Sequence, residues 1–248
     1  MTAVTASPAL LRLYPFWKWL VFLPVAVLAT MIGGLLAVPV AMISPRVANL
    51  YVAVTWSRIL TNMTPAKVIV EGAENIQPGQ SYVVVANHQS QFDIPLIYGY
   101  CGLDLRWVMK AELKHIPFVA AGCRAIGHIF VDRSDPGQAR AAINQAVSRL
   151  EPGTGILFFA EGTRSRTGAL LPFKKGAFRV AIDRQMPVLP MTVTGTREVL
   201  PAGTFKLRPG RVLLKIHPPV SVDGMAMNQA DELLNIVRQK IVSGLKAG

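Results

Sequence analysis

A histidine and an aspartate lie five residues apart in the segment NHQSQFD (87–93). Five positions on a regular helix are about 140° apart around its axis, so His88 and Asp93 can meet only in a tight turn. In such a pair the carboxylate accepts one ring N–H, fixes the tautomer and leaves the other ring nitrogen free to take a proton from a hydroxyl. The segment lacks the G-x-S-x-G elbow of a serine nucleophile, so a substrate hydroxyl would itself attack. Two simpler interpretations remain open: Asp93 only caps a helix, and His88 is a structural histidine.

A second loop, FAEGTRSR (159–166), gathers two arginines, two hydroxyls and a glycine. The planar guanidinium of Arg164 suits a phosphate because it donates two hydrogen bonds at once, and Gly162 lets backbone N–H groups approach an anion closely. The spacing differs from that of a nucleotide-binding P-loop, and a solvated basic loop is the alternative. Arg133, at the end of GHIFVDR (127–133), is a second candidate for a phosphate contact, or else the partner of a nearby aspartate.

Four segments of this chain resemble, in order, the four motifs of the glycerolipid acyltransferase family, which includes bacterial 1-acylglycerol-3-phosphate acyltransferases. They are NHQSQFD (87–93), GHIFVDR (127–133), FAEGTRS (159–165) and VLPMTVTG (188–195). The resemblance implies a mixed α/β domain behind a membrane-associated pair of helices. One departure is Ala160, which stands where the family usually has proline and removes no reactive group.

The resemblance also implies roles for individual residues. The general base and its orienting partner would be His88 and Asp93. The residues that bind the acyl acceptor, with the two arginines on its phosphate, would be Arg133, Glu161, Gly162, Thr163 and Arg164. The implied reaction moves an acyl group from acyl-CoA or acyl carrier protein to the sn-2 hydroxyl of 1-acyl-sn-glycerol-3-phosphate. The product is phosphatidic acid, and no metal ion or cofactor is expected.

Two other functions stay open on the sequence. The acceptor can be a different lyso-lipid, such as a lyso-ornithine lipid, in which case Arg164 binds something other than a phosphate. A protein of a different class is also compatible, namely a non-catalytic membrane protein that binds lipid on the same fold. The intact pair of His88 and Asp93 argues against this second alternative.

The elements that must position these residues are short apolar runs rich in Val, Ile and Phe, which are typical of strands covered on both faces. The runs are 67–72, 81–87, 106–110, 127–131, 155–161, 188–195 and 211–220. Helical stretches lie between or after them, at 94–101, 136–150, 175–184 and 225–245. The alternation predicts an α/β fold with a mixed, largely parallel sheet flanked by helices, and sites in such sheets form beyond the carboxyl ends of strands. The connection 196–210 is expected as a surface loop near the site.

The N-terminal region is expected to associate with a membrane. Residues 20–43 carry no charge and exceed the ~20 residues that a bilayer core requires. An amphipathic stretch, 46–60, follows, so we expect a helical hairpin in residues 1–62 and a catalytic domain in residues 63–248. One or two full membrane spans are the alternative. We expect the protein at the inner (cytoplasmic) membrane with its catalytic domain on the cytosolic side.

The overall charge favours an anionic partner. The chain has 26 Lys and Arg against 14 Asp and Glu, a formal net charge of +12 in 248 residues. This suits a phospholipid surface, lysophosphatidic acid, or a phosphate-bearing thioester such as acyl-CoA or acyl carrier protein. The positive residues are scattered, and no zinc-finger or RNA-binding signature is present, so nucleic acid is not an expected partner. Cys101 and Cys123 show no metal-ligand spacing and are expected as reduced thiols.

Overall fold

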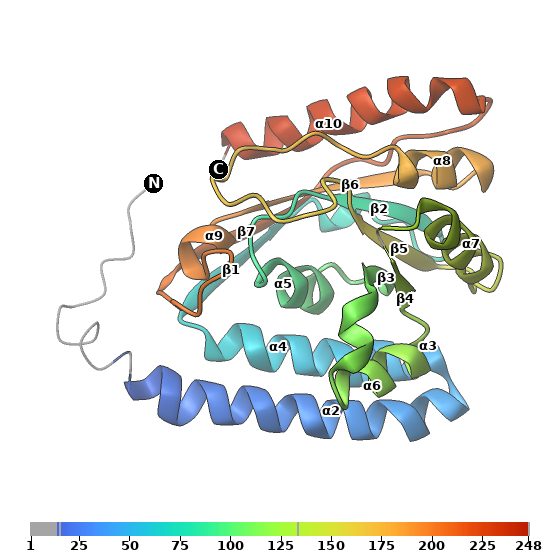
Figure 1. Cartoon of the computed structure of the whole chain (residues 1–248). Helices are drawn as coiled ribbons and strands as arrows, with labels where there is room; N and C mark the ends of the chain where they lie inside the picture. Colours follow the sequence, from blue (N-terminus) through green and yellow to red (C-terminus); the bar gives the residue numbers. More distant parts are fainter. Residues whose placement is uncertain (1–13, 15, 133, 248) are drawn as a thin grey trace.

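A seven-stranded sheet lies between two layers of helices in the computed structural model, which describes residues 14, 16–132 and 134–247 (Figure 1). The strands are β1 (Ala66–Glu71), β2 (Tyr82–Ala86), β3 (Asp104–Lys110), β4 (Ile129–Val131), β5 (Thr154–Phe159), β6 (Val188–Thr194) and β7 (Gly210–Ile216). Their order is β1-β7-β6-β2-β5-β3-β4, and only the β6–β7 pair is antiparallel. The predicted mixed, largely parallel sheet is therefore confirmed, and every predicted run overlaps a strand.

The central strand β2 shows why these runs form strands. Its five residues, YVVVA, are all buried, and they alternate between two cores. Tyr82, Val84 and Ala86 face the core on the side of the N-terminal helices, while Val83 and Val85 face the opposite core. β-Branched side chains pack well on both faces of a pleated strand, and a central strand of a parallel sheet has no solvent-facing side.

Helices cover both faces of the sheet. They are α2 (Leu23–Ile43), α3 (Pro45–Val47), α4 (Val54–Met63), α5 (Asp93–Tyr100), α6 (Val119–Ile126), α7 (Pro136–Val147), α8 (Gly176–Asp183), α9 (Thr196–Val199) and α10 (Ala230–Ala247). Shorter helical turns are η1 (Lys18–Phe22), η2 (Ala48–Ala53), η3 (Ala73–Asn75), η4 (Ala111–His115) and η5 (Met227–Gln229). In Figure 1, α7, α8 and α10 lie on one side of the sheet, and α5 lies between the sheet and the paired α2 and α4.

The structure corrects the predicted helices in two places. The sequence pattern gave no helix between β3 and β4, where α6 and η4 are found. The connection expected as a surface loop, 196–210, begins with α9 and buries Val199 and Leu207, so this segment is partly packed scaffold. The predicted start of the helix 136–150 is confirmed, because the Oδ1 of Asp135 accepts a hydrogen bond from the backbone N–H of Gln138 at 3.0 Å.

The N-terminal helices form the predicted hairpin. Residues Lys18–Ile43 make one continuous helix of 26 residues, long and apolar enough to cross a membrane, and only 11% of its most apolar window is buried. The chain turns at Ser44, whose hydroxyl accepts from the N–H of Val47, and α4 returns antiparallel to α2 (Figure 1). The indole N–H of Trp56 donates to the hydroxyl of Thr30 at 3.0 Å and joins the two arms. The boundary between residues 62 and 63 stays a prediction.

Glycine allows the hairpin to pack closely on the domain. A Cβ at Gly34 of α2 would lie 2.4 Å from the carbonyl oxygen of Phe118, just before α6. The Cα of Gly34 also lies beside Gly122 of α6, where a Cβ would be 3.3 Å away. Any larger residue at Gly34 would push α6 away from α2.

A buried polar cluster also joins the hairpin to the domain. The amide of Asn49, in η2, donates to the Oδ1 of Asp104 at 2.6 Å and accepts a short hydrogen bond from the hydroxyl of Tyr98. Arg106 donates to the same Asp104 oxygen at 2.5 Å. The Nε2 of His128 lies 3.0 Å from the Tyr98 hydroxyl. Burial, with a smaller contribution from Arg106, lowers the pKa of His128 to about 3, so this imidazole is neutral.

Candidate active site

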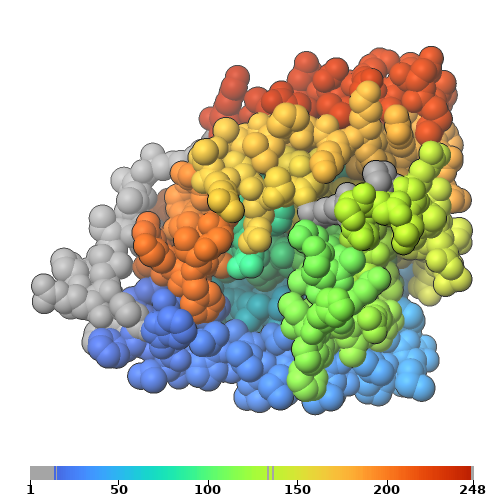
Figure 2. Space-filling view, in the orientation of Figure 1, coloured from blue at the N-terminus to red at the C-terminus, as the bar shows by residue number. Residues whose placement is uncertain are grey.

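The two predicted site loops leave the sheet side by side. β2 and β5 are adjacent and parallel, with Ala86 opposite Phe159, so the segments that follow them start at the same edge. The backbone N–H of Ser165 donates to the carbonyl of His88 at 2.8 Å. In the space-filling view the residues after β2 lie recessed between the yellow segment after β5 and the green η4–α6 region (Figure 2).

His88 and Asp93 form the hydrogen-bonded pair that their chemistry requires. The Nδ1 of His88 lies 2.7 Å from the Oδ2 of Asp93. The same carboxylate oxygen accepts from the backbone N–H groups of Gln89 at 2.7 Å and Ser90 at 2.9 Å. An N-cap accepts from residues after it, whereas Asp93 is the first residue of α5 and accepts from residues before it. The helix-cap interpretation of Asp93 is therefore wrong.

The imidazole of His88 is held in one orientation and one tautomer. Its Nδ1 faces a carboxylate, so Nδ1 carries the proton and Nε2 has a free lone pair. Its ring stacks on Phe159, with centroids 3.8 Å apart and an interplanar angle of 15°. The side chain is 12% exposed. No hydrogen bond joins Nε2 to any group in the part of the chain that the structure describes, so this nitrogen remains available to a substrate.

Glu161 holds the histidine loop, residues 87–93, by a hydrogen bond to its backbone. Its Oε1 accepts from the backbone N–H of His88 at 2.6 Å, and its Oε2 accepts from the N–H of Leu171 at 2.8 Å. Burial raises the pKa of this carboxyl, and the two hydrogen bonds partly offset that rise. Because backbone groups occupy both oxygens, Glu161 acts on the site through the backbone of His88. The sequence placed it among the acceptor-binding residues.

The arginine loop, residues 159–166, contains a buried guanidinium nitrogen. Nitrogen Nη1 of Arg164 is buried and has no hydrogen-bond partner among the described residues. A buried guanidinium N–H without an acceptor is costly, so an anion is favoured beside it. Gly162 has φ +73°, a conformation that favours glycine, and Thr163 is exposed. Arg133 lies outside the described residues, and its contact with a phosphate stays a prediction.

Sequence reasoning missed residues that hold the histidine loop in place. Asn87 exchanges two hydrogen bonds with the backbone of Val193 in β6, at 2.8 and 2.9 Å. The hydroxyl of Ser90 donates to the carbonyl of Leu200 at 2.5 Å, which ties the loop to the segment after α9. A polar residue directly after a buried strand was the available signal for Asn87. The sequence predicted Phe159 only as a strand residue and did not indicate that its ring stacks on His88.

An apolar cavity of about 120 Å³ lies between the hairpin and the domain. Its lining comes from α2, α4, α5, α6 and β3 and includes Gly33, Trp56, Ile94, Trp107 and Phe118. The ring of Trp107 meets Phe159 edge-on, with centroids 6.2 Å apart, and Phe159 is the ring on which His88 stacks. Ile94 follows Asp93 in the chain. The cavity therefore lies close to the pair of His88 and Asp93.

Comparison with known proteins shows the family of this chain. The family model described as Acyltransferase matches residues 67–194. A 1-acyl-sn-glycerol-3-phosphate acyltransferase of Limnanthes douglasii is 30% identical over 82% of this chain and 71% of its own length. The human 1-acyl-sn-glycerol-3-phosphate acyltransferase alpha is 29% identical, over 91% of this chain and 77% of its own.

A solved structure is similar over nearly the whole chain. The crystal structure of the 1-acyl-sn-glycerophosphate (LPA) acyltransferase PlsC from Thermotoga maritima superposes with a TM-score of 0.81. The two sequences are 31% identical, and the match covers 95% of this chain and 96% of the other. The chain belongs to the acyltransferase family and is an enzyme that transfers acyl groups.

Proposed function

We propose that this enzyme transfers an acyl group from acyl-CoA or acyl carrier protein to the sn-2 hydroxyl of 1-acyl-sn-glycerol-3-phosphate. The observation that best supports this substrate is the unpaired Nη1 of Arg164 on the loop next to His88. A phosphate on Arg164 would place a glycerol hydroxyl near the free Nε2 of His88. The names of the relatives from Limnanthes douglasii and human state the same acceptor for those proteins.

The mechanism follows from the paired side chains. Nε2 of His88 takes the proton of the acceptor hydroxyl while the hydroxyl oxygen attacks the thioester carbonyl carbon. Asp93 stabilises the imidazolium through the 2.7 Å hydrogen bond to Nδ1. The C–S bond then breaks, the imidazolium returns the proton to sulfur, and a free thiol leaves. The apolar cavity beside Trp107 would hold the acyl chain away from water.

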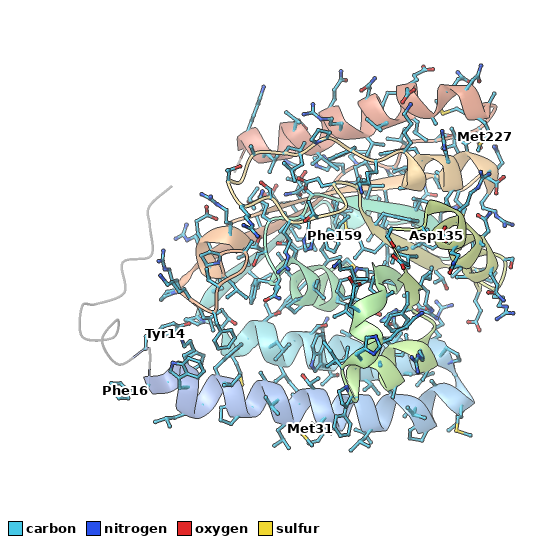
Figure 3. The ribbon with its side chains drawn as sticks, in the orientation of Figure 1. Tyr14, Phe16, Met31, Asp135, Phe159 and Met227 are labelled. Carbon is cyan, nitrogen blue, oxygen red and sulfur yellow. The ribbon has the colours of Figure 1, made fainter. Side chains whose placement is uncertain are left out.

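We further propose that the hairpin lies in the cytoplasmic leaflet of the inner membrane, with the sheet on the cytosolic side. Large apolar side chains of α2 are exposed, among them Leu28 at 56%, Leu35 at 60% and Ile43 at 89%. Met31 lies on the outer side of α2 in Figure 3. The face that α2 turns away from the domain therefore suits hydrocarbon. A tag at residue 1 that proteases reach only from the cytosolic side would support this leaflet-bound hairpin, and a tag reached from the opposite side would refute it.

The function is tested with purified enzyme, radiolabelled acyl thioester and a panel of lyso-lipid acceptors. We expect 1-acyl-sn-glycerol-3-phosphate to be acylated fastest, and His88→Ala to abolish transfer in a folded protein. His115→Ala, which changes an exposed histidine, is the matched control and keeps full activity. A preference for lyso-ornithine lipid would replace the proposed acceptor. Absence of thioester-dependent thiol release with every acceptor would favour the non-catalytic alternative.

A further inference from the structure

A second hollow opens on the face of the sheet opposite the hairpin. This groove, of about 340 Å³, lies between α7 and α8, a size within the range of small-molecule sites. Its floor is apolar and includes Val108, Ile143, Phe158 and Val180. Phe159 and Met227, both labelled in Figure 3, also line it. Of the predicted functional residues that the structure describes, Gly162 alone lies in this lining.

The groove reaches the reacting groups at one end. Phe159 and Ala160, at the carboxyl end of β5, line it, while the ring of Phe159 packs in the core on the hairpin side and stacks there on the imidazole of His88. Gly162, two residues before Arg164, lines it as well. The side chain of Lys174 lies over Gly162, since a Cβ there would be 2.8 Å from the Lys174 Cε. A ligand in the groove can therefore reach His88 around the carboxyl end of β5, past Ala160 and Gly162.

The rim of the groove is positively charged. Arg140 of α7, Arg179 of α8 and Lys174 are exposed cations of its lining. None of the three forms an ion pair with a residue that the structure describes. The one carboxylate in the lining, Asp183, lies 3.3 Å from Arg184, which is outside the lining. These cations lie above an apolar floor, and neighbouring carboxylates do not neutralise them. Such a groove suits an elongated ligand that carries phosphates and a neutral arm.

We propose that this groove binds the phosphate-bearing carrier of the thioester donor, with the phosphopantetheine arm over the apolar floor and phosphate at Arg140 and Arg179. This proposal rests on the proposed acyl transfer. The two parts of the donor would then bind in different hollows. The acyl chain suits the apolar cavity on the hairpin side, and the carrier suits the cationic groove. The thioester between them lies at His88, where the C–S bond breaks and the sulfur takes the proton that Nε2 removed from the acceptor.

The test removes both arginines while leaving the catalytic loops intact. The variant Arg140→Gln/Arg179→Gln is compared with Arg124→Gln/Arg149→Gln, which removes two exposed cations of another hollow. We expect the KM for acyl-CoA to rise about 10-fold or more in the groove variant, from the loss of charged hydrogen bonds, with kcat and the acceptor KM within about 2-fold. The control variant keeps the wild-type KM. An acyl-pantetheine thioester, which lacks phosphate, should react equally with wild type and groove variant.

The same measurement with acyl carrier protein as donor locates the contacted phosphate. A raised KM for both donors assigns the arginines to the phosphate of the pantetheine arm, and a raised KM for acyl-CoA alone assigns them to the nucleotide phosphates. An unchanged KM for both donors, or a rise in the acceptor KM alone, refutes the proposal.

Equilibrium binding of coenzyme A to wild type and groove variant separates this inference from the proposed function. Failure of wild type to acylate any lysophosphatidic acid would reject the acceptor. Weaker coenzyme A binding in the groove variant would still support the carrier site, and equal binding would reject it.

Discussion

The hydrogen bond between His88 and Asp93 gives the most direct test of the mechanism, through the substitution Asp93→Asn. An asparagine keeps the shape of the side chain and can still accept hydrogen bonds from the His88 ring and from the backbone N–H groups of Gln89 and Ser90. The tautomer of His88 is therefore preserved. What is lost is the negative charge that faces the imidazolium as it forms.

The size of the effect follows from this geometry. With Nδ1 and Oδ2 2.7 Å apart, the two charge centres are near contact. Two unit charges about 4 Å apart at an effective dielectric constant of about 20 interact by roughly 4 kcal/mol, which corresponds to about 1,000-fold in rate. The amide dipole of asparagine replaces part of this, so we expect kcat to fall about 100- to 1,000-fold. The acceptor KM should stay nearly constant, because none of the hydrogen bonds of Asp93 involves the arginine loop.

The assay follows thiol release from acyl-CoA across a range of acceptor concentrations. The Oδ1 of Asp93 is buried without a partner among the described residues, so the asparagine N–H₂ takes an equally unpaired place there. We expect the free energy of unfolding to change by at most about 1–3 kcal/mol, and thermal unfolding verifies that the variant is folded. Asp223→Asn, on a distant exposed turn, is the control. A folded Asp93→Asn variant that loses less than 10-fold in kcat, or that changes only KM, would refute the role of the charge.

Arg164→Ala should raise the KM for 1-acyl-sn-glycerol-3-phosphate about 10-fold or more, with a smaller change in kcat, because a charged hydrogen bond to phosphate is lost. Steady-state kinetics check this, and an unchanged acceptor KM would place the phosphate elsewhere. Because of His128, the free energy of unfolding should be lower at acidic pH. The His128 pKa of about 3 in the folded protein lies below the ordinary histidine pKa of 6.5, so stability is lost as pH falls from 6.5 towards 3, at up to about 1.4 kcal/mol per pH unit. Thermal unfolding of His128→Asn should show a shallower decline in this pH range, and parallel curves would contradict the assignment. Leu28→Lys/Leu35→Lys should reduce binding to phospholipid vesicles at least about 10-fold, since each exposed leucine contributes about 1.5–3 kcal/mol when buried. Equal sedimentation of this variant and wild type with vesicles would show that α2 does not insert.

Much of the fold was predictable because β2 and its neighbours are continuously apolar, and strands buried on both faces require that pattern. Helix α6 was not predictable. It begins after Phe118, whose φ is +62°, and no helix-capping residue in the sequence indicates this start. The helix is held by the close packing of Gly122 on Gly34. Such a helix depends on tertiary contact more than on local sequence.

The site was predictable in its composition and less so in its contacts. The spacing of His88 and Asp93 allowed either a pair or a cap, and only the direction of the aspartate side chain decides between them. The sequence likewise could not show whether Glu161 faces a ligand or backbone N–H groups, because both are suitable partners of a carboxylate. The burial of Nη1 of Arg164 without a partner among the described residues is a property of the folded chain that the loop sequence does not show.

The hydrogen bonds that Asn49 makes with Asp104 and Tyr98 have a consequence for catalysis at a surface. An anchor on a flexible tether would let the imidazole sample many heights above the bilayer. Here buried hydrogen bonds join the hairpin to the sheet, so under the proposed insertion the depth of α2 in the leaflet would set the level at which His88 takes the proton. Leaflet thickness and curvature would then tune turnover by changing how far a lipid must rise to reach it, with no change in the chemistry itself.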